Sequence, residues 1–258
     1  MKKLMGMILI LIVMASVIAG CGESKDKASG SSGKEDKKVL KMATSADFPP
    51  FESRDPEGNF KGFDIELGQM IADELGYKLE IEDMQFDGLI GALQAKRVDM
   101  VMAGMSATKE RKKNAEFSTE YHRSGESFLV EADSNINSIE DLKGKKVGVQ
   151  LGTIQEEGAE KLAKEYDFEI KKVDKAGLLV QELNSNRIDV GYMDKTVADG
   201  YAKEQDLKVF ADPTESSPGM GIAFPKGSDL VADVNKVLAK FEKDGILKEL
   251  EDKWVNKK

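Results

Sequence analysis

The chain has 258 residues, of which 40% are hydrophobic and 33% are charged, and its mean hydropathy is −0.40. These values exclude a polytopic membrane protein and a wholly disordered chain. The formal net charge of −9 disfavours binding to the phosphate backbone of nucleic acids. One cysteine and one histidine exclude an intramolecular disulfide, a multi-thiolate metal site and a histidine-rich metal site, so we expect neither a metal nor another cofactor.

The N-terminus has the pattern of a secretory signal peptide. Lys2 and Lys3 precede an apolar run of roughly sixteen residues, 4–19, which is shorter than the ~20 residues that a membrane-spanning helix needs. The tetrapeptide IAGC at residues 18–21 resembles the lipobox of bacterial lipoproteins, in which the cysteine is lipidated and becomes the mature N-terminus. The alternatives are a plain signal peptide and a membrane anchor in which Cys21 is incidental.

Residues 22–38 contain no large apolar side chain, and such a segment cannot offset the conformational entropy lost on ordering. We therefore expect a signal peptide at 1–20 and a lipidated cysteine with a disordered tether at 21–38. The mature protein is then extracytoplasmic and anchored to the cell membrane, on its periplasmic face or at the cell surface, through the lipid on Cys21.

From residue 39 the hydrophobic pattern predicts strands that alternate with helices. Gly76, at the end of the first predicted helix, is typical of a C-cap. The alternation indicates an α/β fold with mostly parallel sheets. The predicted strands are 39–44, 78–82, 98–103, 127–131, 145–150, 169–173, 188–193, 207–210 and 220–224. The predicted helices are 62–77, 86–96, 108–114, 153–166, 176–186, 196–205, 229–243 and 246–255.

The chain also contains an internal repeat. Residues 89–99 and 179–189 each comprise an amphipathic helix, a turn with an arginine and a buried strand that begins at an aspartate. Two related α/β halves predict two lobes with a cleft between them, and ligands typically bind in such clefts.

Four polar segments follow predicted strands, at 45–48, 104–111, 152–155 and 193–195. In open α/β sheets ligands bind at the carboxyl ends of the strands, where helix N-termini offer N–H groups to anions. Ser106 and the guanidinium of Arg111 are suited to a carboxylate, and Asp194 is suited to an ammonium group. Together these groups describe a receptor for an α-amino acid.

Each of these residues also has a purely structural interpretation. Arg111 lies in a run of basic residues that is typical of a solvated surface, and Asp194 is placed to cap the following helix. Phe48 and Phe86 fit core positions, and Gly104 fits a turn.

The body of the chain resembles a known family over residues 39–254. The motifs that carry the resemblance are ATSADFPPFE, GFDIEL, FDGLIGALQAKRVDMVMAGMSATKERKK, FSTEY, GKKVGVQLGTIQEE and RIDVGYMD. They closely resemble the extracytoplasmic amino-acid-binding proteins of ABC importers, solute-binding protein family 3. The resemblance implies a two-lobed periplasmic-binding-protein-like fold, or Venus flytrap, with two hinge crossovers. Its lobes would comprise residues 39–128 with 222–258, and residues 129–221.

The resemblance also implies roles for individual residues at the two ends of the ligand backbone. Arg111 would bind the ligand α-carboxylate, with Ser106 and the carbonyl of Gly104 nearby. Asp194 would bind the α-ammonium group.

Further contacts are implied for the second lobe and for the ligand side chain. Thr153, Ile154 and Gln155 would contact the carboxylate through backbone N–H groups. Phe48 and Phe86 would form apolar walls around the side chain.

The ligand class depends on the polar residues near those walls. In several relatives that bind cationic ligands an acid occupies the position of Ser45, whereas here Asp47 stands two residues on. Ser45, Asp47, Gln150 and Gln155 would be left unpaired by an aliphatic ligand, at ~1–3 kcal/mol each if buried. We therefore expect a polar or cationic ligand, with arginine or lysine ahead of glutamine.

The resemblance implies a monomeric transport protein that delivers an unmodified amino acid to the membrane subunits of an ABC permease. An extracellular sensor module is one alternative, although it would normally carry a downstream membrane segment and the chain ends at Lys258. A dehydratase or lyase on the same fold is another, although residues 104–108 lack the second glycine of a nucleophile elbow. The single histidine, His122, is expected at the surface or at a lobe edge.

Overall fold

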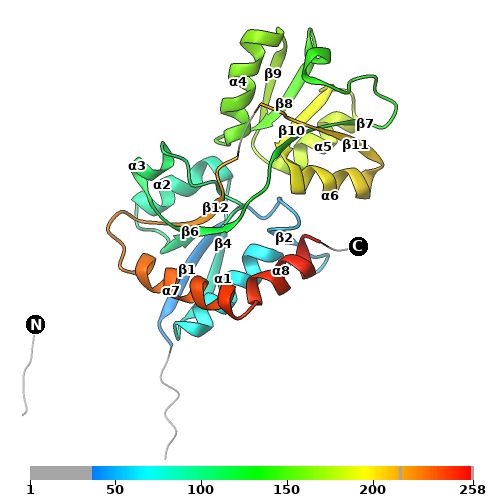
Figure 1. The fold of residues 1–258 in the computed structure, drawn as a ribbon. Helices are drawn as coiled ribbons and strands as arrows, with labels where there is room; N and C mark the ends of the chain where they lie inside the picture. The colour runs from blue at the N-terminus through cyan, green and yellow to red at the C-terminus, as the bar shows by residue number, and fades with distance from the viewer. Residues whose placement is uncertain (1–36, 215–216, 257–258) are drawn as a thin grey trace, which may run out of the picture. The chain divides into compact units, whose positions relative to one another are not determined.

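Two five-stranded sheets, both packed against helices, form the part of the chain that this computed structural model describes, residues 37–256 without 215 and 216 (Figure 1). The expected signal peptide, Cys21 and most of the expected tether lie outside these residues. The expectation of an α/β fold with two lobes is confirmed. We call the elements around the first sheet the first lobe and those around the second sheet the second lobe.

The first sheet has the strand order β4-β1-β5-β12-β6. β1 is parallel to β4 and β5, whereas β12 is antiparallel to both of its neighbours. The strands span Val39–Thr44 (β1), Lys78–Asp83 (β4), Met100–Val101 (β5), Glu116–His122 (β6) and Met220–Phe224 (β12).

Helices cover this sheet because its strands carry apolar side chains on both faces. Leu40 and Met42 of β1 join the core that α1 and α7 form, while Ala43 joins a second core with Leu89 and Leu93 of α2. The other elements of the first lobe are α1 (Phe63–Glu74), η1 (Phe86–Gly88), α2 (Leu89–Gln94), α3 (Arg111–Asn114), α7 (Leu230–Lys243), α8 (Ile246–Trp254) and the small pair β2 (Ser53–Arg54) and β3 (Phe60–Lys61).

The second sheet has the order β11-β7-β10-β8-β9 and repeats this plan. β8, β9 and β10 are parallel, and β7 is antiparallel to β10 and β11. The strands span Glu126–Glu131 (β7), Lys146–Gln150 (β8), Glu169–Val173 (β9), Val190–Asp194 (β10) and Leu207–Ala211 (β11). The helices are η2 (Ile139–Leu142), α4 (Ile154–Tyr166), α5 (Ala176–Asn184) and α6 (Lys195–Gln205).

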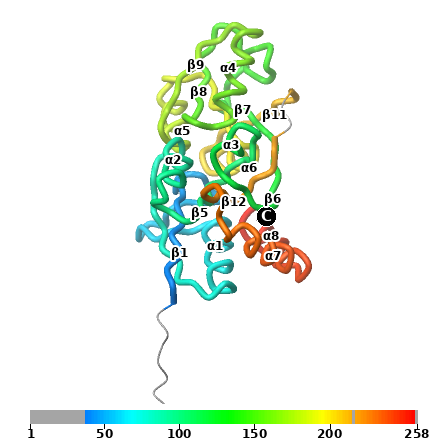
Figure 2. The backbone as a smooth tube through the Cα atoms, turned by 90° about the vertical axis from the view of Figure 1, so that its left-hand side faces the viewer, coloured from blue at the N-terminus to red at the C-terminus, as the bar shows by residue number. Residues whose placement is uncertain are grey.

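The chain crosses between the two sheets twice, and the crossings lie side by side. The first joins β6 to β7 and the second joins β11 to β12 (Figures 1 and 2). Arg123 in the first crossing donates a hydrogen bond of 2.8 Å to the carbonyl oxygen of Ser217 in the second. The divisions expected after residues 128 and 221 fall inside β7 and β12, so the sheets place the two crossings a few residues earlier, before Glu126 and Met220.

The expectation of mostly parallel sheets is wrong in part. A strand that arrives from the other lobe enters its sheet at the end where the parallel strands finish, so β7 and β12 run antiparallel to them. β6 was not among the predicted strands because its buried residues, Ser118 and Tyr121, do not alternate. The register shifts between β6 and β12 account for this spacing.

Within the described residues, none of the helices is both long enough and apolar enough to cross a membrane.

Gly62 allows α1 to begin against the loop that follows β1. The N–H groups of Phe63 and Asp64 donate to the carbonyl oxygens of Pro50 and Phe51, at 3.0 and 2.9 Å. A Cβ atom on Gly62, whose φ is +133°, would lie 2.1 Å from the carbonyl oxygen of Phe51. This close approach fixes the position of residues 50–52 over the start of α1.

We expect Gly62→Ala to lower the free energy of unfolding by about 2–5 kcal/mol, because backbone strain and overlap add. The measurement is urea denaturation of the ligand-free protein. Gly76→Ala is the matched control, since Gly76 also has a positive φ of +76° but has open space around it, and its cost is about 1–2 kcal/mol. Equal losses in the two variants would contradict the argument from overlap.

Candidate functional site

A cavity lies between the two lobes, at the ends of β1, β5, β8 and β10. Cavities between domains are common sites for small organic ligands. The structure brings all eleven candidate ligand-binding residues to this cavity: Ser45, Asp47, Phe48, Phe86, Gly104, Ser106, Arg111, Thr153, Ile154, Gln155 and Asp194. Glu52, Ala103, Gln150 and Met220 complete the lining.

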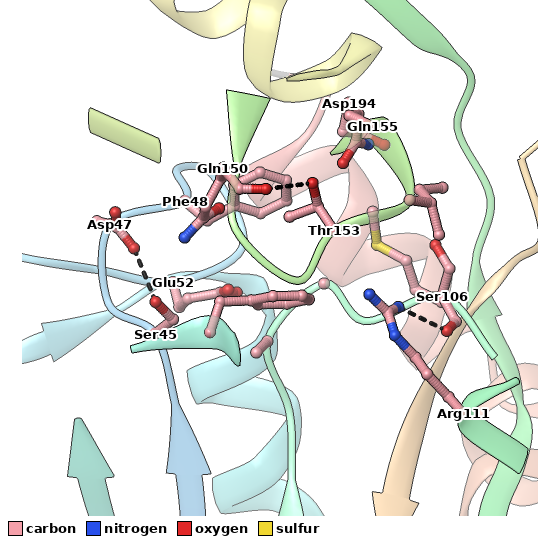
Figure 3. A pocket seen from close by; sticks show the side chains of 15 residues that line it. Ser45, Asp47, Phe48, Glu52, Ser106, Arg111, Gln150, Thr153, Gln155 and Asp194 are labelled. Atoms are coloured by element: carbon pink, nitrogen blue, oxygen red, sulfur yellow. Dashed lines mark hydrogen bonds between the residues drawn. The ribbon is translucent and has the colours of Figure 1, made fainter. Parts of the chain in front are cut away.

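Arg111, the first residue of α3, lies at one end of the cavity (Figure 3). Its guanidinium donates hydrogen bonds of 2.9 Å to the carbonyl oxygens of Ser106 in the first lobe and Gly152 in the second. The guanidinium carbon lies 5.2 Å from the centre of the Phe86 ring. Burial lowers the pKa of Arg111 to about 10, so the group is still a cation at neutral pH. Arg111 therefore lies in the cavity, and not on the solvated surface that its run of basic residues is typical of.

Asp194 ends β10 and caps α6. Its Oδ1 accepts hydrogen bonds from the N–H groups of Thr196 and Val197, at 2.8 and 3.3 Å. The residue is 2% exposed, and burial raises the pKa of Asp194 to about 6 against the opposing effect of these N–H groups. The helix-cap interpretation and the position in the cavity are therefore both correct, because one carboxylate oxygen suffices for the cap.

The start of α4 forms the part of the wall contributed by the second lobe. Thr153 caps this helix, since its Oγ1 accepts the N–H of Glu156 at 3.1 Å and donates to the carbonyl oxygen of Gln150 at 2.7 Å. The amide nitrogen of Gln155 donates to the buried carboxylate of Glu126. Because the nitrogen of the Gln155 amide makes this bond, its oxygen can accept a hydrogen bond from another donor.

The two aromatic walls combine a structural position with a place in the cavity. Phe48 stacks on Phe51 with ring centres 6.0 Å apart, and Phe86 packs on the core formed with α2. A Cβ atom on Gly104, whose φ is +55°, would lie 2.8 Å from the ring of Phe48. The absence of a side chain at Gly104 therefore allows Phe48 to reach the cavity.

Glu52 lines the cavity but was not singled out by the sequence analysis. It is 0% exposed, and among the described residues its carboxyl oxygens have neither a backbone N–H group nor a cationic side chain as partner; the buried carboxyl group of Asp64 lies beside it. Burial raises the pKa of Glu52 well above its usual range, and the nearby carboxyl groups of Asp64, Asp47 and Asp194 raise it further. The signal for Glu52 was its place in the PPFE segment, beside the predicted Phe48.

Asp64, behind the cavity wall, adds a second buried acid. Its Oδ2 accepts hydrogen bonds of 2.8 Å from the N–H of Gly104 and from the hydroxyl of Tyr121. Burial raises the pKa of Asp64 to about 6. This carboxyl group therefore holds the turn at Gly104 in place.

Asp47 lies at the end of the cavity away from Arg111 (Figure 3). Its Oδ1 accepts a hydrogen bond of 3.0 Å from the hydroxyl of Ser45, and its Oδ2 accepts one of 3.4 Å from the N–H of Gly177. Both oxygens of the acid that was expected to face the ligand side chain thus have protein partners.

His122, which was expected at the surface or at a lobe edge, is the last residue of β6, next to the first crossing, and its side chain is only 7% exposed. It packs against the rings of Phe51 and Phe63, and its Nδ1 lies 3.1 Å from Oε1 of Glu251, which comes from the last helix of the chain. No cluster of histidine, cysteine and acidic residues suited to a metal ion occurs in residues 37–256 as described.

Comparison with known proteins gives the family. The bacterial extracellular solute-binding proteins, family 3, match residues 40–257. The chain belongs to this family.

Two similar proteins are described as arginine-binding. The arginine-binding extracellular protein ArtP of Bacillus subtilis (strain 168) is 42% identical over 252 residues, which cover 95% of this chain and 96% of ArtP. The solved structure of an ancestral arginine-binding protein bound to arginine is 42% identical, with a TM-score of 0.80, and covers 85% of this chain and 99% of that one.

A third similar protein is relevant to the alternative that the chain is an enzyme. It is the ancestral amino acid-binding protein AncCDT-1, a precursor of cyclohexadienyl dehydratase. It is 38% identical with a TM-score of 0.79, and covers 84% of this solute-binding protein and 95% of the ancestral chain.

We compare the free energy of unfolding of Asp194→Asn with that of the wild type, both ligand-free. We expect the difference to favour the variant more at pH 7 than at pH 4. The pKa of Asp194 is raised in the folded state, so its ionisation lowers the free energy of unfolding between pH 4 and 6, and the loss persists above pH 6. Asparagine still caps α6 and does not ionise, so the relative gain is about 2–3 kcal/mol. Urea denaturation at both pH values measures it.

Asp194→Ala separates the two roles of this residue. It removes both the charge and the cap of α6, so it should be about 1 kcal/mol less stable than Asp194→Asn at either pH. A difference between Asp194→Asn and wild type that does not change with pH would contradict the buried-charge argument.

Proposed function

We propose that this solute-binding protein is a receptor for a cationic amino acid, with L-arginine as the ligand that fits best, and that it delivers this ligand to an ABC permease. The observation that carries the proposal is Glu52, a fully buried carboxyl group that lines the cavity and lies near the carboxyl groups of Asp64, Asp47 and Asp194 instead of near a cation. A buried acid without a cationic partner is costly, and a ligand cation removes that cost.

The cavity offers a place for each polar group of an α-amino acid. The ligand carboxylate would bind Arg111, whose two hydrogen bonds to carbonyl oxygens leave three of its five N–H donors, and the N–H groups at the start of α4. The α-ammonium group would bind Asp194 and the carbonyl oxygen of Gly104. The side chain would lie between Phe48 and Phe86.

Counting charges favours a cationic side chain. The lining has one guanidinium, Arg111, and the carboxyl groups of Asp47, Glu52 and Asp194. Asp47 already has partners on both oxygens. A ligand with one carboxylate and two cationic groups would pair Arg111, Asp194 and Glu52, whereas a neutral side chain would leave Glu52 unpaired. The arginine-binding description of ArtP and the arginine bound to the ancestral protein support the same ligand.

We expect Glu52→Gln to weaken L-arginine binding by roughly 10–150-fold, which corresponds to the loss of a charge-assisted hydrogen bond. The binding of L-lysine should weaken by a similar factor, while L-glutamine should bind the variant as tightly as the wild type or more tightly. Isothermal titration of both proteins with the three amino acids measures this.

Glu57→Gln is the matched control, since Glu57 is an exposed acid in the loop between β2 and β3, outside the cavity lining. A wild-type protein that binds only leucine or valine would overturn the proposal of a cationic ligand. We also infer that the ligand is released unchanged, as the binding-protein names of its relatives suggest. Recovery of a converted product from the titration cell would favour a dehydratase or lyase instead.

The protein acts outside the cytoplasm, as its family does. We further propose that residues 1–20 are a cleaved signal peptide, that Cys21 carries the lipid, and that the rest of the segment up to residue 38 tethers a monomeric receptor to the membrane. The support is the IAGC sequence and the composition of residues 22–38.

We expect Cys21→Ser to move the protein from the membrane to the soluble or secreted fraction and to abolish incorporation of labelled palmitate, because stable anchoring requires the acyl chains. Fractionation of cells measures the first effect. Ser29→Ala in the tether is the control and should remain membrane-bound. A Cys21→Ser protein that stays in the membrane would mean that residues 4–19 anchor the chain themselves.

A further inference from the structure

Asp47 connects the first lobe to two helices of the second lobe. Its Oδ2 accepts the hydrogen bond from the N–H of Gly177 in α5, at 3.4 Å. Its carbonyl oxygen accepts one of 3.2 Å from the hydroxyl of Tyr201 in α6. The hydroxyl of Ser45 holds the remaining Oδ1 within the same loop. Two of the three contacts therefore cross from one lobe to the other.

The first of these contacts meets a need of α5. The residue before this helix is Lys175, whose side chain forms no cap, and the N–H groups of a first helical turn have no acceptor within the helix. An aspartate oxygen is a preferred acceptor at that position, and the helix dipole favours its negative charge. Asp47 thus supplies the cap of α5 from the other lobe.

The environment of Asp47 depends on this contact. Burial raises the pKa of Asp47, and the hydrogen bonds of Ser45 and of the N–H groups at Gly177 and Ala176, with the charge of Lys175, act in the opposite direction. Three of these four compensating groups belong to the second lobe. If the lobes separate, the carboxylate loses them and returns to water.

We propose that Asp47 and Tyr201 form a latch that stabilises the closed arrangement of the lobes and so sets the affinity for every ligand, while Glu52 selects among ligands. Both carboxylate oxygens of Asp47 already accept hydrogen bonds from the protein, whereas the carboxyl group of Glu52 has no backbone N–H or cationic partner among the described residues. The inference rests on the proposed function only in requiring that an amino acid closes the lobes.

The latch and the selecting residue differ in their thermodynamic signature. A ligand that binds the closed state has an apparent affinity that is reduced by the fraction of protein unable to close. Destabilising closure therefore multiplies the dissociation constants of all ligands by one factor. A change at a group that contacts the ligand side chain alters their ratios instead.

The test uses Tyr201→Phe, Asp47→Ala, Asp47→Asn and the double variant Asp47→Ala/Tyr201→Phe in the full-length protein. Isothermal titration measures the dissociation constants of L-arginine, L-lysine and L-glutamine. Tyr201→Phe and Asp47→Ala should each raise all three by about 2–10-fold, the effect of one lost hydrogen bond, and by the same factor within about twofold. Asp47→Asn should raise the dissociation constants by less, because its amide oxygen can still accept the hydrogen bond from the N–H of Gly177.

Two further readouts separate a latch from a general loss of stability. The double variant should raise each dissociation constant by the product of the two single-variant factors. Asp47→Ala retains the carbonyl oxygen that Tyr201 contacts, so each substitution removes a different hydrogen bond. Small-angle scattering at a fixed, sub-saturating arginine concentration should show a larger radius of gyration in each variant. Tyr166→Phe, in α4 and outside the cavity lining, is the matched control and should change neither.

If Asp47→Ala weakens the binding of arginine and lysine but not that of glutamine, the latch is overturned, because Asp47 would then contact the ligand side chain. Unchanged dissociation constants in both Asp47→Ala and Tyr201→Phe would overturn it as well. A wild-type protein that prefers a neutral amino acid would instead contradict the proposed ligand. The common factor would still be measured with that amino acid, so the two failures are distinguishable.

Discussion

The cavity holds more acid than base, and this imbalance governs the rest of the site. Asp47, Glu52 and Asp194 face a single guanidinium in the lining, and Asp64 lies directly behind the wall. Enclosing carboxylates without partners is unfavourable in a medium of low dielectric constant. An empty cavity therefore opposes closure unless some of these groups take up protons. A ligand that brings positive charge removes the opposition, so the acids link closure to occupancy.

Three of the four acids also support the scaffold. Asp194 caps α6, Asp64 holds the turn at Gly104, and Asp47 meets the start of α5. Each has backbone N–H groups as partners, which stabilise a carboxylate in a fixed position. Glu52 has none of these partners, so its only means of compensation is a proton or a ligand. Selectivity for the ligand side chain can therefore change at Glu52 with little effect on the fold.

Local patterns were sufficient to predict the parallel strands, most helices and the residues at the strand ends, because hydrophobic periodicity and the rule for ligand sites in α/β sheets are local in the sequence. Glu52 could not be found in this way. Its burial depends on Gly62 and the start of α1, and its neighbours in space include Asp194. The burial of the His122 side chain could not be predicted for the same reason, since its partner Glu251 lies 129 residues away. The partners of Asp47 in α5 and α6 are equally distant in sequence.

The opposite end of the cavity shows how one scaffold can serve ligands with different side chains. Arg111 binds carbonyl oxygens of both lobes, Ser106 in the first and Gly152 in the second. A ligand carboxylate placed on this guanidinium therefore adds to contacts that already join the lobes, whatever side chain the ligand carries. We infer that the part shared by all α-amino acids adds to the contacts of Arg111, while the acidic end contributes both the lobe contacts of Asp47 and the discrimination at Glu52. Because the lobes are joined through Arg111 and Asp47 and not through Glu52, the side chain at position 52 can change while these contacts persist.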